Sequence, residues 1–187
     1  MSSKRTSAQP SAPKPPTSLD PTIIISEQAS LTGKKLISIG SNTVIHPRCK
    51  LNSTYGTIEI GNYCIISERC RIGLQSEPSR GEADKLLVEN GVVIETGAIV
   101  EASRIGEGSV IEINSKIGKG AIIGKFCKIG PFCEVADGEV VPNHTVIFGL
   151  GQHRQDQSGA DTKKIKLLLK QIEVLKKLIP SNLAHFQ

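Results

Sequence analysis

The sequence is poor in aromatic residues and has no long apolar run. Only 3% of its 187 residues are aromatic, and Trp is absent. Aromatic platforms for stacking nucleic-acid bases, and a core built on large rings, are therefore not expected. No apolar run approaches the roughly 20 residues that a membrane-spanning helix needs, and Met1–Asp20 lacks the apolar segment of a secretory signal. We expect an intracellular protein with a core of small aliphatic side chains.

Positive charge is concentrated near the two ends of the chain. The formal net charge is +5, but basic residues outnumber acidic ones mainly in 1–21 and 163–179, which leaves 22–162 slightly acidic. A nucleic-acid-binding domain usually has a basic face, so nucleic acid is not expected as a partner. Residues 1–21 hold five of the ten prolines among Ser, Thr and Lys. This composition predicts a disordered arm.

An aliphatic residue recurs every six positions over much of the chain. The longest unbroken series is Ile105, Ile111, Ile117, Ile123, Ile129, Val135, Val141 and Ile147. Because six is a multiple of the two-residue period of a strand, each hexad is predicted to be a short strand and a turn. The aliphatic residue and the residue four positions later then both face inward. Three hexads per coil predict a triangular prism over 22–150, with a loop extruded at 74–87.

All five cysteines fall on the second inward position of a hexad, where side chains are small. They are Cys49, Cys64, Cys70, Cys127 and Cys133. The CxxC spacing of many metal sites is absent. The pattern therefore predicts reduced thiols that fill the core, as expected in a reducing compartment.

A helical period replaces the hexads near the end of the chain. After a linker at 151–162, an amphipathic helix is predicted at 163–179 and a tail at 180–187, with Asp161 and Thr162 as N-cap and Pro180 as terminator. Its apolar stripe is Ile165, Leu168, Leu169, Ile172, Leu175, Leu178 and Ile179. We expect this stripe to pack on one flat side of the prism. A partner-binding helix and a basic membrane-surface helix remain alternatives.

The hexad pattern resembles the left-handed parallel β-helix family of hexapeptide-repeat proteins. The resemblance implies an all-β fold, a left-handed parallel β-helix of about six coils with one C-terminal α-helix. Such proteins are often acyltransferases or γ-type carbonic anhydrases, which depend on histidine. When the sequence is aligned through Arg104–Gly106, the three zinc-ligand positions carry Gly73, Thr96 and Glu101. No metal site is therefore expected.

One histidine at an outward position could serve in an acyltransferase, which is the alternative function. His46 follows Ile45 and is the candidate general base, whereas His144 lies in a late coil and His153 and His185 lie in the linker and tail. Apart from this alternative, we expect no catalytic residue, no cofactor-binding residue and no cofactor.

Three stretches also resemble the β-helical subunits of the dynactin pointed-end complex: Ile39–Cys49, Ser109–Glu112 and Glu139–Gly149. This resemblance implies a non-catalytic adaptor in the cytoplasm and cytoskeleton that supports dynein–dynactin cargo attachment in microtubule-based transport. The implied partners in this hetero-oligomer are dynactin subunit 5, the pointed-end actin-related protein and the p62-type subunit, without membrane insertion. The alternative is an acyltransferase or γ-carbonic-anhydrase-like enzyme that acts as a homotrimer.

Overall fold

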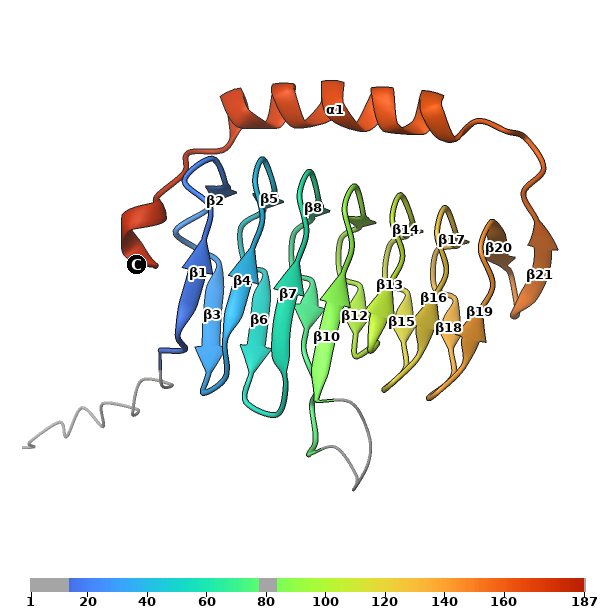
Figure 1. Ribbon diagram of the computed structural model, residues 1–187, viewed down its shortest axis with the longest axis horizontal. Coiled ribbons are helices and arrows are strands. Elements are labelled where there is room, and N and C mark those ends of the chain that lie inside the picture. Colours follow the sequence, from blue (N-terminus) through green and yellow to red (C-terminus); the bar gives the residue numbers. More distant parts are fainter. Residues whose placement is uncertain (1–13, 78–83, 187) are drawn as a thin grey trace, which may run out of the picture.

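The chain forms a parallel β-solenoid with one long helix along its side (Figure 1). This computed structural model describes residues 14–77 and 84–186. Strands of successive coils pair in parallel and build three sheets, which are the three faces of a prism. The prediction of a solenoid of about six coils with a single C-terminal helix is confirmed.

The strands are short because each hexad supplies only one strand and one turn. Sheet 1 contains β1 (Thr17–Leu19), β4 (Ile37–Ile39), β7 (Thr57–Ile60), β10 (Lys85–Val88), β13 (Arg104–Ile105), β16 (Ile122–Ile123) and β19 (Val140–Val141). Sheet 2 contains β2 (Ile24–Ile25), β5 (Val44–Ile45), β8 (Ile65–Ile66), β11 (Val93–Ile94), β14 (Val110–Ile111), β17 (Lys128–Ile129), β20 (Thr145–Phe148) and β21 (Gln152–Gln155). Sheet 3 contains β3 (Ser30–Gly33), β6 (Lys50–Ser53), β9 (Arg71–Ile72), β12 (Ile99–Val100), β15 (Lys116–Ile117) and β18 (Glu134–Val135).

The strand pairing in the solenoid follows the six-residue period of the sequence. Ile105 pairs with Ile123, and Ile123 pairs with Val141, so that residues 18 positions apart stack in one column. These side chains are buried, and so are all five cysteines, which are free thiols. The predicted inward columns of aliphatic residues and thiols are therefore confirmed.

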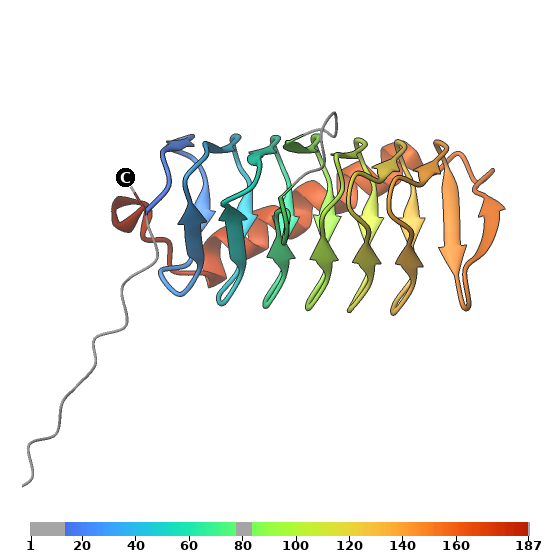
Figure 2. The same cartoon turned by 90° about the horizontal axis from the view of Figure 1, so that it is seen from below.

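The helix α1 (Asp161–Leu178) covers sheet 2 along the length of the solenoid (Figures 1 and 2). Leu168 and Ile172 are buried in a cluster with Ile24, Val44 and Ile65, the outward residues of β2, β5 and β8. The expectation that the apolar stripe packs on a flat side is confirmed for Leu168, Ile172, Leu175 and Ile179. It is wrong for Leu178, which is 69% exposed. The predicted N-cap is wrong: Asp161 and Thr162 already belong to the helix, and Ala160 precedes it without a side-chain cap.

Three of the predicted boundaries differ from the structure. Part of the arm expected at 1–21 is β1, which pairs with β4, while residues 1–13 lie outside the described residues. The expected linker 151–162 contains β21, which pairs antiparallel with β20. The loop expected at 74–87 ends earlier, because β10 starts at Lys85; residues 78–83 are not among those described.

The described part of the tail expected at 180–187, residues 180–186, covers the first coil. Ser181 Oγ accepts a hydrogen bond from Ile25 N at 3.1 Å, and Asn182 N donates to Ile25 O at 3.0 Å. A short 3-10 helix, η1 (Leu183–His185), follows, and Phe186 is buried in the main core. These bonds satisfy backbone groups that the edge of the first coil would otherwise leave unpaired.

Candidate active site

His46, the histidine favoured by the sequence, lies at the corner between sheets 2 and 3, directly after β5. Its Nε2 is buried and has no hydrogen-bond partner among the described residues. Burial lowers the pKa of this imidazole, and the negative charge of Glu68 opposes that effect. A buried Nε2 is out of reach of a substrate at the surface. The geometry therefore does not favour His46 as a general base.

A row of residues with left-handed backbone follows the corner where sheet 1 turns into sheet 2. This corner row is Asn42, Tyr63, Gly91, Gly108, Phe126 and His144, all with φ between 53° and 68°. Neighbouring members are one coil apart, and backbone bonds such as Phe126 N to Glu107 O (2.8 Å) and His144 N to Lys125 O (2.8 Å) tie each turn to the preceding coil. The corner row thus has a fixed spacing along the solenoid.

A groove of about 380 Å³ separates the corner row from α1. It is lined by Asn62, Tyr63, Asn90, Gly91, Glu107, Gly108, Ile165, Leu168 and Leu169. Gly91 leaves the space open, because a Cβ at this position would lie 3.5 Å from Leu168 Cδ2. The helix contributes only aliphatic side chains, so that wall of the groove is apolar.

Phe126 and His144 continue the line of the groove toward the last coil. The Phe126 ring lies against Gly108, where any Cβ would overlap it. The His144 ring stacks on Phe126, with a centroid distance of 5.6 Å and an interplanar angle of 13°. The imidazole is therefore held in a fixed orientation close to the end of the groove.

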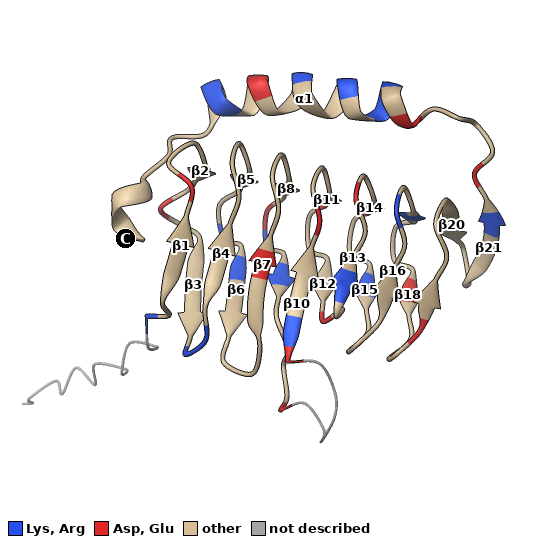
Figure 3. Ribbon diagram, in the orientation of Figure 1, with Lys and Arg blue, Asp and Glu red and all other residues tan. Residues whose placement is uncertain are grey.

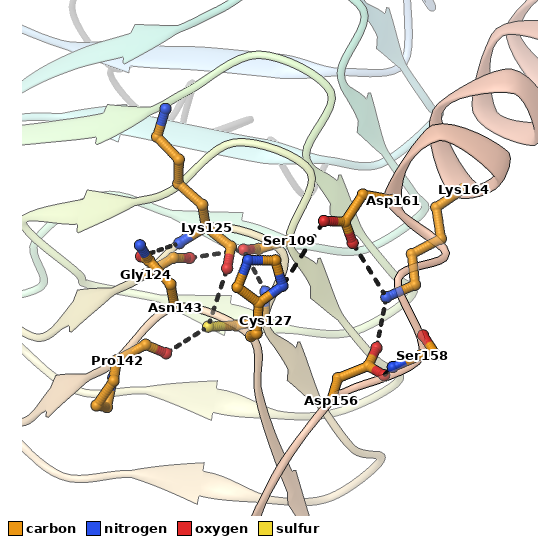
Figure 4. Close-up of polar contacts among 11 residues, drawn as sticks. Ser109, Gly124, Lys125, Cys127, Pro142, Asn143, Asp156, Ser158, Asp161 and Lys164 are labelled. Atoms are coloured by element: carbon orange, nitrogen blue, oxygen red, sulfur yellow. Dashed lines mark hydrogen bonds and ion pairs between the residues drawn. The ribbon is translucent and has the colours of Figure 1, made fainter.

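A carboxylate from α1 stands beside this imidazole. His144 Nδ1 lies 3.7 Å from Asp161 Oδ2, which is ion-pair distance, and the His144 side chain is 41% exposed. Lys164 Nζ bridges two carboxylates, at 2.7 Å from Asp156 Oδ2 and 3.9 Å from Asp161 Oδ1 (Figure 4). Asp156 N donates to His144 O at 2.6 Å, which fixes the loop before the helix.

The groups around His144 carry opposite charges. Hydrogen bonds from Lys164 and then Ser158 lower the pKa of Asp156, so its carboxylate is ionised at neutral pH. One lysine faces two carboxylates, which leaves one negative charge next to the imidazole. A reachable histidine whose Nδ1 faces a carboxylate is the arrangement of a general base.

Neither Cys127, which lies near this cluster, nor Cys64, which lies in an earlier coil, is available as a nucleophile. Cys127 Sγ donates to Pro142 O at 3.0 Å (Figure 4), and burial raises the pKa of this thiol. Burial raises the pKa of Cys64 to about 12. Because the thiolate is the reactive form, these cysteines act as core residues.

A second, more polar cavity of about 480 Å³ lies over sheet 3 and the β20–β21 hairpin. Its lining includes Glu101, Lys116, Glu134 and His153, and His153 Nε2 is 4.0 Å from Glu139 Oε1. Within residues 14–77 and 84–186, no three His, Cys, Asp or Glu side chains are grouped as metal ligands. The described part of this cavity thus offers a histidine but no metal centre.

The sequence interpretation did not select His144 or Asp161. One signal was present: Phe126 and His144 are 18 residues apart, which is one coil, so their stacking follows from the hexad register. Asp161 carries no such signal, because its position depends on how α1 returns along sheet 2.

The comparisons with known proteins agree with the fold. Residues 102–137 match the family described as bacterial transferase hexapeptide (six repeats). No curated protein matches the sequence. A hexapeptide transferase family protein from Anaplasma phagocytophilum has a similar structure, with a TM-score of 0.61 and 16% identity over 87% of this chain and 90% of that one.

Two further solved structures share the architecture. A candidate acetyltransferase from Bacillus cereus has a TM-score of 0.59 and 18% identity over 87% of this chain and 92% of that one. The acetyltransferase domain of PglB from Neisseria gonorrhoeae, in complex with acetyl coenzyme A, has a TM-score of 0.51 and 15% identity over 70% of this chain and 54% of that one.

These comparisons contradict two expectations. The expectation of a non-catalytic dynactin adaptor is corrected because the similar structures are described as transferases, and none of these findings points to a dynactin subunit. The expectation that the chain is not an enzyme is corrected for the same reason. The expected partners and location stay predictions. Repeat, register and structural likeness together show that this chain has the hexapeptide-repeat β-solenoid fold.

Proposed function

We propose that this protein is an acyltransferase, which moves the acyl group of a coenzyme A thioester to an amine or a hydroxyl group. The observation that carries the proposal is the His144–Asp161 pair near the end of an apolar groove. The likeness to acetyltransferase structures, one of them with acetyl coenzyme A bound, supports this class of reaction.

The chemistry needs one general base, which is His144. As the acceptor nitrogen or oxygen attacks the thioester carbonyl, the imidazole takes the proton that the acceptor loses. Asp161, 3.7 Å from Nδ1, stabilises the imidazolium that forms. The tetrahedral intermediate then expels the coenzyme A sulfur, which receives the proton from His144. The products are the acylated acceptor and the free thiol.

The groove explains how an acyl group could be placed. Its volume of about 380 Å³ is enough for a short aliphatic chain, and Ile165, Leu168 and Leu169 exclude water from that wall. Phe126 lies between the groove and His144 and sets their relative positions.

Release of thiol from acetyl coenzyme A, followed with a set of primary amines and sugar hydroxyls as acceptors, tests the proposal. His144→Ala should lower kcat by about 10²- to 10⁴-fold, the usual range for loss of a general base. His153→Ala is the matched control, because His153 is also exposed and lies beside a carboxylate; it should leave kcat unchanged. His46→Ala should likewise retain kcat.

Two results would overturn the proposal. One is the absence of any acetyl coenzyme A binding in calorimetry with the folded protein. The other is turnover that survives His144→Ala while His46→Ala or His153→Ala abolishes it, which would place the base elsewhere.

A further inference from the structure

The lysines of α1 fall into two groups with different surroundings. Lys164 and Lys176 are partly buried and bonded, to Asp156 and to Asn42 and Glu173 respectively. The other group is exposed and has no ion-pair partner among residues 14–77 and 84–186. The members of this exposed group are Lys163, Lys166, Lys170 and Lys177. Ion pairs of the exposed group therefore do not contribute to the stability of the fold.

Three of these free lysines form a line on the outer side of the helix. Lys163, Lys170 and Lys177 are seven residues apart, which is close to two helical turns. The buried residues Leu168 and Ile172 define the opposite side, which faces sheet 2. The line of lysines therefore points away from the solenoid.

Large apolar side chains lie next to these lysines. Leu167, Val174 and Leu178 are 67%, 55% and 69% exposed, and their spacing of seven and four residues places them on one line as well. Packing on the solenoid does not require them, because the inner stripe already supplies Leu168 and Ile172. An exposed apolar line beside a basic line on one helix is typical of segments that lie at a membrane surface.

We propose that the outer face of α1 is a docking surface for an anionic lipid bilayer. The helix would lie flat, with the ammonium groups of Lys163, Lys166, Lys170 and Lys177 at the lipid phosphates and carboxylates. The side chains of Leu167, Val174 and Leu178 would enter the headgroup region. Basic residues near an anionic leaflet are attracted to it, and aliphatic side chains add affinity when they leave water.

The position of α1 in the molecule suits this role. Figure 1 shows the helix as the outermost element over sheet 2, along most of the length of the solenoid, and Figure 3 shows basic residues on most of its turns, with one acidic turn between them. No helix among the described residues is long and apolar enough to span a bilayer. The proposed contact is therefore a surface contact, made without change in the fold.

Co-sedimentation of the full chain with vesicles tests the docking surface. We expect binding to vesicles of phosphatidylcholine with about one-third phosphatidylserine, no binding to phosphatidylcholine alone, and weaker binding as salt rises. The variant Lys163→Gln/Lys170→Gln/Lys177→Gln should bind about 100-fold more weakly, at about fivefold per lysine. Leu167→Gln/Leu178→Gln should also lose most binding, although it keeps all the charges.

A matched variant tests whether binding depends on the charges of this face or only on the net charge of the protein. Lys34→Gln/Lys50→Gln/Arg71→Gln removes three exposed positive charges away from α1 and should bind anionic vesicles almost as well as the unchanged chain. Equal losses in the two triple variants would overturn the proposal, as would equal binding to neutral and anionic vesicles. Lysine-dependent capture of an acidic protein by a chain that binds no vesicles would also overturn it. Thermal melts confirm that each variant is folded.

Discussion

Cys127 illustrates how little space an inward position of this solenoid provides. Its side chain is 1% exposed, Sγ donates to Pro142 O, and its backbone N donates to the hydroxyl of Ser109, one coil earlier in the same column. Ser109 makes an equivalent bond to Gly124 O at 2.7 Å. A small side chain that can donate one hydrogen bond is therefore what this column accepts.

Substitutions at Cys127 should distinguish the effect of side-chain size on stability from the effect of hydrogen bonding. Cys127→Ser should cost no more than about 1 kcal/mol, because a hydroxyl can donate the same bond. Cys127→Leu should cost about 1–3 kcal/mol by overpacking the coil. Urea denaturation of both variants measures the difference. Equal stability of the two would contradict the inward position of this thiol.

At the scale of the element, α1 depends on one buried side for its place on the solenoid. Ile172 is 1% exposed and packs with Ile24, Val44 and Ile65, whereas Val174 is 55% exposed. Ile172→Ala should destabilise the protein by about 2–5 kcal/mol, and Val174→Ala should stay within about 0.5 kcal/mol. The free energies of unfolding of the two variants test this. Similar values would mean that α1 is not held by its inner stripe.

The sequence indicates which face of the prism the helix covers. The residue just before each inward aliphatic points outward, and in sheet 2 it is aliphatic in every coil except at Lys128. The aliphatic members are Ile24, Val44, Ile65, Val93, Val110 and Val146. In sheet 3 the same position is mostly charged, with Lys50, Arg71, Lys116 and Glu134. The period of six therefore predicts the prism, and this outward position predicts its covered face.

The parts that were not predicted depend on contacts between distant segments. Ser181 and Asn182 bond to Ile25, across more than 150 residues. The His144–Asp161 pair forms only because α1 runs back along sheet 2 and brings Asp161 to the last coil. Local periodicity carries no information on such contacts, so neither the end cap nor the candidate site followed from it.

At the scale of the whole molecule, the two ends of the solenoid are closed differently. The first coil is covered by Ser181, Asn182 and the buried Phe186, and the last coil continues into the antiparallel strand β21. An open coil end offers unpaired backbone groups to another chain. The C-terminal segment therefore protects the first coil from end-to-end association.

Removal of residues 181–187 should expose that end. We expect a lower melting temperature and concentration-dependent self-association, seen by size-exclusion chromatography with light scattering. Phe186→Ala is the companion variant: it keeps the backbone bonds to Ile25 and loses only the ring, so it should be less stable by about 3–5 kcal/mol yet remain monodisperse. A truncated chain that stays monodisperse at high concentration would contradict this role.

The fit between α1 and sheet 2 also limits how the protein can change in length. Its 18 residues span about 27 Å at about 1.5 Å per residue, and neighbouring strands are about 4.8 Å apart. Insertion of one 18-residue coil would preserve every inward column, but it would move Asp161 away from His144 by one strand spacing unless the helix gained about three residues. The solenoid can thus grow only in whole coils, and only together with its helix.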